Sequence, residues 1–197
     1  MQVFLYFRYM TKCLYIILLL ISSHAALTAQ MLQWRDALQA DPLSVRALDC
    51  SGLKWDSLPK EIYRFVNLET LDLSKNKLHE LPEQFIAFTQ LKHIDLGRNK
   101  LAVFPLALCQ LTNLQVLHLD RNFITKIPIQ VTQLENLQEL DLYANAIEDF
   151  GEGLFMLPQL KVLNLEGVMY GTVFAKNLTA KLPQTKVMMD PPCKCLD

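Results

Sequence analysis

The sequence lacks an excess of positive charge. It holds 19 Lys and Arg against 20 Asp and Glu, for a formal net charge of −1. Removal of the first 29 residues would take away Arg8 and Lys12 but no acidic residue, which leaves 17 basic and 20 acidic side chains and a net charge of −3. A nucleic-acid-binding protein needs a basic patch or stripe. The charge balance therefore predicts no nucleic-acid partner.

The sequence also lacks an apolar run long enough to cross a bilayer comfortably, which takes about 20 residues. Its longest candidate is "CLYIILLLI", from Cys13 to Ile21. Two basic residues precede this run and small residues follow it, as in a secretory signal peptide. We expect residues 1–29 to be such a peptide, cut after Ala29, with Ala25 and Ala26 as alternatives. The competing reading joins "VFLYF" to the run and makes an uncleaved membrane anchor, although Arg8 and Lys12 interrupt it.

Cysteines are few and no CxxC motif is present, so the usual spacing of a redox or zinc motif is missing. Cys13 falls in the expected signal peptide, which leaves Cys50, Cys109, Cys193 and Cys195. An exported protein can form disulfides, but four cysteines do not reveal their pairing. We expect Cys50 to be a small residue of the core and Cys109 to lie on the convex side of the fold. The disulfide pairing of the four cysteines stays open.

What the sequence does contain is a repeat of 23 residues. Steps of 23 from Val45 reach five leucines without a single insertion or deletion. The successive starts are Val45, Leu68, Leu91, Leu114, Leu137 and Leu160. Further apolar residues recur three and five positions after each start. Asparagine then recurs at Asn76, Asn99, Asn122 and Asn145, and a Leu/Phe/Ile–Pro pair ends at Pro59, Pro82, Pro105 and Pro128, with Gly151 breaking the series.

This pattern, LxxLxLxxNxLxxLPxxLxxLxx, resembles the leucine-rich repeat family over residues 45–168. The resemblance implies an α/β fold: a right-handed leucine-rich-repeat solenoid, or short horseshoe, with a concave parallel β-sheet. It also implies a convex side of turns and 3₁₀ segments, with helical caps at the ends. The expected organisation is a signal peptide at 1–29, an N-terminal cap at 30–44, six repeats at 45–168 and a C-terminal cap and tail at 169–197.

Elementary physical chemistry agrees with this fold. In "LDL" both leucines point to one face and the residue between them to the other. One repeat cannot bury its apolar side alone, so neighbours must stack. Buried asparagines must bond the backbone of adjacent turns, because an unpaired buried amide is costly. We expect the "MLQWRDALQADP" and "YGTVFAKNLTAKLP" segments to form cap helices, the second with Val173, Phe174, Leu178 and Leu182 on one side, and "TKVMMD" to form a last strand.

The concave face provides the candidate site. Its central column reads Asp49, Asp72, Asp95, His118, Asp141 and Asn164. Lys75, Arg98 and Arg121 lie close to this column and can offset its charge. The simplest interpretation of each aspartate is a solvated surface group, since exposed ion pairs usually contribute little to stability. We expect Asp95 and Asp141 to flank His118 and to favour its protonated form.

We predict a binding site rather than a catalytic centre. Its residues are His93, Asp95, Arg98, Val116, His118, Arg121 and Tyr143, with Phe123 at the rim. A zinc site needs ligands that converge, and a hydrolytic triad needs a pocket and an oxyanion hole, whereas a sheet points its side chains in parallel. We therefore expect no enzyme activity, no catalytic residue, no cofactor and no metal.

The resemblance implies a non-catalytic module that binds another protein or a peptide. The expected signal peptide predicts that it acts outside the cytoplasm, secreted or periplasmic, with no membrane contact after signal cleavage. The alternative is a structural or envelope-associated protein held at the membrane by an uncleaved N-terminus. The partner, its biological process and the oligomeric state stay open. The sequon Asn177-Leu178-Thr179 has a meaning only in a host that glycosylates exported proteins.

Overall fold

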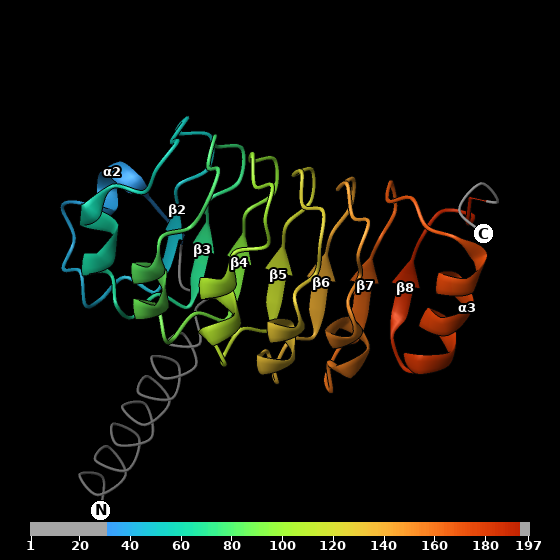
Figure 1. The fold of residues 1–197 in the computed structure, drawn as a ribbon. Coiled ribbons are helices and arrows are strands. Elements are labelled where there is room, and N and C mark those ends of the chain that lie inside the picture. Colours follow the sequence, from blue (N-terminus) through green and yellow to red (C-terminus); the bar gives the residue numbers. More distant parts are fainter. Residues whose placement is uncertain (1–30, 194–197) are drawn as a thin grey trace, which may run out of the picture. The chain divides into compact units, whose positions relative to one another are not determined.

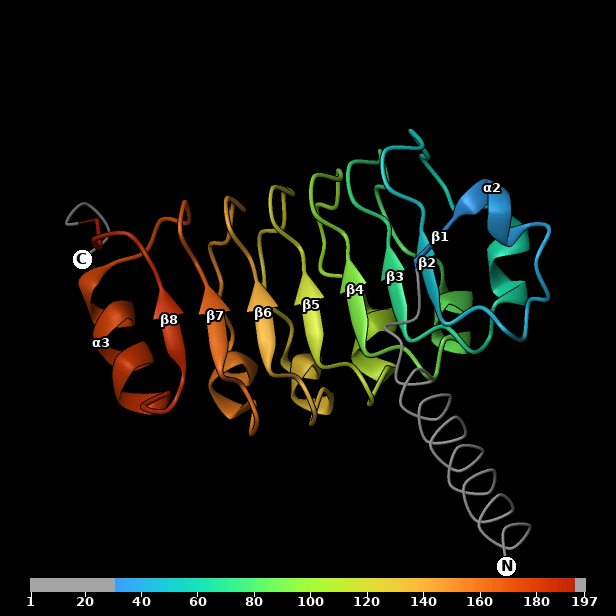
Figure 2. The ribbon, with the colours of Figure 1, turned by 180° about the vertical axis from the view of Figure 1, so that it is seen from behind.

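The computed structural model describes residues 31–193 of the 197-residue chain, and the expected signal peptide lies outside this range. The described residues form one eight-stranded sheet in which every strand is parallel to its neighbours and follows chain order, β1 to β8. Figure 1 shows the strands side by side, and Figure 2 shows the opposite face of the same sheet. The expected leucine-rich repeat solenoid is confirmed.

The strands are short and evenly repeated. They are β1 (Leu32–Gln33), β2 (Ala47–Asp49), β3 (Thr70–Asp72), β4 (His93–Asp95), β5 (Val116–His118), β6 (Glu139–Asp141), β7 (Val162–Asn164) and β8 (Lys186–Met188). From β2 to β7 each residue pairs with the residue 23 positions further on, as Leu71 does with Ile94. The constant repeat length therefore becomes a constant strand register.

The opposite side of the solenoid is built of five 3₁₀ helices, one for each interval between strands β2 to β7. They are η1 (Lys60–Arg64), η2 (Glu83–Ala87), η3 (Leu106–Gln110), η4 (Ile129–Gln133) and η5 (Glu152–Met156). Proline stands directly before η1 to η4, and Gly151 directly before η5. Proline suits this position because its fixed φ favours the start of a helix and it has no N–H to satisfy.

The core lies between these two layers. Its members include leucines in and directly after the strands, such as Leu71 and Leu73, and apolar residues of the turns and 3₁₀ helices, such as Phe85 and Phe88. Each fully buried side chain of this size stabilises the fold by roughly 1.5–3 kcal/mol. Cys50 and Cys109 are buried and free, Cys109 inside η3, whereas Cys193 is disulfide-bonded.

The buried asparagines bond the backbone, as the repeat pattern predicts. The amide of Asn122 donates to the carbonyls of Leu96 at 2.9 Å and Leu119 at 3.0 Å, and its oxygen accepts the N–H of Leu101 at 3.0 Å. Asn76, Asn99 and Asn145 repeat this pattern. Each asparagine thus connects one repeat to the repeat before it.

The ends differ from the expectations in two respects. At the start, helix α2 covers only Trp34–Ala37, and the residues before it form β1, a strand that the sequence did not predict. At the end, helix α3 (Thr172–Lys181) buries Leu178, but Val173 is 66% exposed and does not share its buried side. The last strand, β8, is confirmed. Within residues 31–193 no helix is both long and apolar enough to span a membrane.

Candidate binding face

Two columns of side chains run across the outer face of the sheet. The strand pairing places Asp95, His118 and Asp141 side by side in one column. The same pairing places His93, Val116 and Glu139 in the other. Neighbouring strands of a sheet lie about 4.8 Å apart, so successive side chains of a column are within reach of each other.

The face is hollowed over strands β3 to β5. A shallow depression of about 230 Å³ is lined by residues of both columns and by Met31, which enters from the N-terminal end. Its other lining side chains include Thr70, His93, Val116 and His118. Histidine, aliphatic and carboxylate groups thus lie around one concavity, and among residues 31–193 no second layer covers this side of the sheet (Figure 2).

The aspartates of the central column have a structural role that the sequence interpretation missed. The Oδ1 atom of Asp95 accepts the N–H of Gly97 at 2.8 Å, and that of Asp141 accepts the N–H of Tyr143 at 2.8 Å. Asp49, Asp72 and Asn164 make the same bond to the residue two positions on. These are Asx turns, which direct the chain out of each strand. The aspartates are therefore only half-exposed turn formers rather than freely solvated charges.

His118 is the one member of this column that lacks an amide or carboxylate oxygen for the turn. Its Nε2 atom lies 3.1 Å from Oε1 of Glu139, and its Nδ1 atom lies 4.0 Å from Oδ2 of Asp95. The strand pairing places Asp95 and Asp141 on either side of His118, as expected. The shortest contact of the imidazole is nevertheless with Glu139, which belongs to the neighbouring column.

Two carboxyl groups near His118, those of Asp95 and Asp120, have raised pKa values. Burial raises the pKa of Asp95, and the charges of Asp72 and Asp120 add to this, while the Gly97 N–H and His118 oppose it. Burial also raises the pKa of Asp120, with a further contribution from Asp141. A Cβ atom at Gly97 would collide with the Asp120 carboxylate, so the missing side chain makes room for it.

Arg121 and Tyr143 form the next part of the face. The guanidinium of Arg121 lies over the Tyr143 ring, 5.0 Å from its centre, and its Nη1 atom lies 3.9 Å from Oδ2 of Asp120. A cation over an aromatic face is stabilised by roughly 0.5–1 kcal/mol at an exposed site. Arg98 is exposed one repeat earlier. Tyr and Arg anchors are favoured in protein interfaces.

The arrangement of polar groups is poorly suited to the two chemical alternatives. Ser74, which follows β3, is only 7% exposed, so its hydroxyl is not available as a nucleophile on this face. Within residues 31–193 no three His, Cys, Asp or Glu side chains are grouped as a metal site would need. His93 instead lies 3.5 Å from the Thr70 hydroxyl.

Three residues of this face were missed at the sequence level. Glu139 and Asp120 could have been found by continuing the 23-residue step, because Glu139 follows Val116 and Asp120 precedes Tyr143 in their columns. Met31 could not, since it stands before the first repeat.

The repeat pattern, the sheet and the asparagine ladder define a family. The family model described as "Leucine rich repeat" matches residues 66–124 and 112–167, and the chain belongs to this family. No curated protein compared with the chain matches it.

Solved structures of leucine-rich repeat proteins are similar to this fold. A leucine-rich repeat protein of Leptospira interrogans is 28% identical with a TM-score of 0.66, over 82% of this chain and 48% of that one. The ectodomain of the Arabidopsis thaliana membrane receptor kinase GASSHO1/SCHENGEN3, in complex with CASPARIAN STRIP INTEGRITY FACTOR 2, is 26% identical with a TM-score of 0.55, over 66% and 16%. An internalin of Listeria monocytogenes, at 18% identity and a TM-score of 0.61 over 76% and 44%, shows the fold alone. The chain spans less than half the length of each of these proteins.

Proposed function

We propose that this protein is a non-catalytic module that binds another protein or a peptide through the concave face of its sheet. The observation that carries the proposal is the hollow over β3 to β5, which combines apolar, histidine and carboxylate side chains on a face that no other described element covers. The contact set comprises His93, Asp95, Arg98, Val116, His118, Arg121 and Tyr143, together with Glu139 and Asp120. The plant receptor ectodomain, solved in complex with another factor, supports this class of activity.

Export belongs to the same proposal. The segment 1–29 acts as a signal peptide, and the mature protein is secreted or periplasmic, with 30–44 and 169–197 as caps around six repeats. N-terminal sequencing of the exported protein tests this directly. A start at Gln30 supports it, whereas an intact Met1 in a membrane fraction favours the anchored, envelope-associated alternative.

The binding face is tested by capture of partners with the mature protein. The triple variant Arg98→Ala/Arg121→Ala/Tyr143→Ala should lose at least about tenfold in captured partner, because central Arg and Tyr anchors carry most of an interface's binding energy. A matched control, Lys60→Ala/Arg64→Ala/Gln110→Ala, removes two cations and one uncharged residue, all exposed, from the convex 3₁₀ helices. Equal capture by both variants would contradict the proposal.

His118 offers a second readout of the same face. If the partner contacts the group formed by His118, Asp95 and Glu139, substitution of His118 should weaken capture of the partner. The variant His118→Asp introduces the residue found at this position in the neighbouring repeats, so it should change the contact while preserving the fold. Unchanged capture by this variant would show that the partner does not contact this group.

A further inference from the structure

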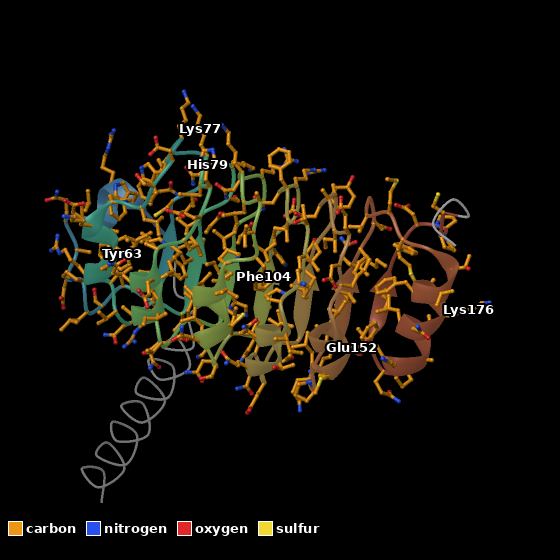
Figure 3. All side chains as sticks on the ribbon, in the orientation of Figure 1. Tyr63, Lys77, His79, Phe104, Glu152 and Lys176 are labelled. Carbon is orange, nitrogen blue, oxygen red and sulfur yellow. The ribbon has the colours of Figure 1, made fainter. Side chains whose placement is uncertain are left out.

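The loops that follow strands β2 to β5 carry two rows of cations, which we call the basic ridge. One row holds Lys54, Lys77 and Lys100, and the other holds Lys75, Arg98 and Arg121. Members of a row are 23 residues apart, and all six side chains are exposed. Figure 3 shows Lys77 at the edge of the solenoid where these loops gather. The net charge of the whole chain, −1, conceals this local concentration.

The backbone holds both rows in register. The N–H of Lys77 donates back to the Trp55 carbonyl at 2.7 Å, and the N–H of Lys75 donates forward to the Gly97 carbonyl at 2.8 Å. The next repeat makes the same two bonds. Successive cations of a row are therefore spaced by the sheet itself, about 4.8 Å apart at the backbone.

Most of these charges have no intramolecular partner in the described structure. Of the six cations, Arg121 alone forms an ion pair with a side chain within residues 31–193, at 3.9 Å from Asp120. Lys75 lies near enough to Asp49 to lower the pKa of that carboxyl, but no ion pair forms. The remaining charges are available to an external anion.

Four of the six cations also stand in a backbone conformation that favours glycine. Their φ angles are 62° at Lys54, 56° at Lys75, 56° at Arg98 and 51° at Arg121. The first and last repeats use Gly52 and Gly167 where the middle repeats use the second row. A side chain with positive φ costs on the order of 1 kcal/mol and commonly marks a functional position. Folding alone does not require long cationic side chains here.

The shape of the ridge indicates the kind of anion. The ridge is two residues wide, and the aspartate column of the concave face runs directly beside it. A flat layer of anionic lipid headgroups would therefore meet the acidic column as well as the cations. We propose that the basic ridge binds a flexible linear polyanion carrying sulfate or phosphate groups, laid across successive repeats.

The first test measures binding of heparin and inorganic polyphosphate to the mature protein over a series of salt concentrations. The variant Lys54→Gln/Lys77→Gln/Lys100→Gln should bind both polymers at least about tenfold more weakly at 0.1 M salt, and the slope of log affinity against log salt should fall by about 2, or 0.7 for each cation removed. The control Lys161→Gln/Lys176→Gln/Lys186→Gln removes the same charge from exposed positions near the C-terminal end. It should bind like the wild type.

A second test separates binding from folding. Lys75→Gly should weaken polyanion binding without lowering the melting temperature, because glycine accepts φ 56° freely. Ala144→Gly makes the same backbone change at the equivalent place two repeats beyond Arg98, φ 52°, without a loss of charge, and should leave binding unchanged. Equal binding by ridge and control variants overturns the proposal. Binding to anionic vesicles but not to the free polymers also overturns it.

Discussion

At the scale of single residues, the fold depends on buried asparagines whose hydrogen bonds water cannot replace. Asn122 is 4% exposed and satisfies two carbonyls and one N–H that belong to two successive loops. A second set of asparagines bonds carbonyls at the exposed side, as Asn113 does with Thr89 at 2.9 Å. The two sets make the same chemical bonds in different surroundings, so they permit a direct comparison of burial.

Asn122→Ala should lower the free energy of unfolding by about 3 kcal/mol, because it leaves several buried backbone groups without partners. Asn113→Ala removes an exposed bond and should cost about 0.5 kcal/mol, since water replaces it. Chemical denaturation of both variants measures the difference. Similar losses would show that burial does not set the strength of the ladder.

The environment of Asp120 predicts how the stability of the protein depends on pH. The pKa of Asp120 is raised above the ordinary value of 3.8, mainly by burial and then by Asp141, so ionisation opposes folding. A group with a raised pKa in the folded state stabilises fully below pH 3.8 and loses this contribution as pH rises through the folded value. Asp120→Asn should therefore stabilise the protein at pH 7, by about 0.5 kcal/mol after allowance for screening. The gain should vanish near pH 3 when stability is followed from pH 7 downwards, and an advantage that persists there would contradict it.

At the scale of elements, the entry into each 3₁₀ helix decides which residue is allowed. Pro128 precedes η4 with φ −76°, whereas Gly151 precedes η5 with φ 58°. Proline cannot adopt a positive φ, so the series of prolines had to end here. A Cβ atom at Gly151 would also collide with the carbonyl oxygen of Ile127.

Gly151→Ala should therefore destabilise the protein by at least about 2 kcal/mol, the sum of an unfavourable φ and a collision with backbone. Gly52→Ala is a matched comparison, because Gly52 has φ 68° but nothing within 4 Å of the added atom. It should cost about 1 kcal/mol, the conformational part alone. Thermal melts of the two variants separate the two effects.

At the scale of the whole molecule, each repeat contacts only its neighbours, so the ends should open more readily than the middle. Two buried thiols report on this. Cys50 lies beside β2 near the N-terminal end, and Cys109 lies in η3 near the centre. Burial raises the pKa of Cys109 to about 12 and also raises that of Cys50, so neither reacts while its repeat is closed.

Alkylation at pH 8 should modify Cys50 several times faster than Cys109 under native conditions, and both at the same rate in concentrated denaturant. Peptide mapping by mass spectrometry distinguishes the two sites. Identical native rates would mean that the solenoid opens as one cooperative unit rather than from its ends.

The repeat itself was readable from the sequence, because a solenoid turns a linear period directly into a spatial one. The resemblance carried by this period implied the sheet and the convex turns, while the spacing of leucines and asparagines predicted which side chains are buried and that the asparagines bond the backbone. The columns of the binding face follow from the same period, which is why His93, Asp95, Val116 and His118 were predicted to share one face and do so. Whether they bind a partner stays a prediction.

Only the tertiary structure decided which contacts form between the columns and where residues outside the 23-residue repeat lie. The closest partner of His118 is Glu139, which belongs to the other column, and the linear pattern does not reveal this contact. β1 forms only because β2 offers an open edge, and two residues carry no periodic signal of their own. The rows of cations follow the 23-residue period, but their exposure, and the lack of side-chain ion-pair partners for most of them among the described residues, are seen only in the tertiary structure. Side-chain chemistry along the chain thus determined the fold, while contacts between repeats determined the surface that a partner would meet.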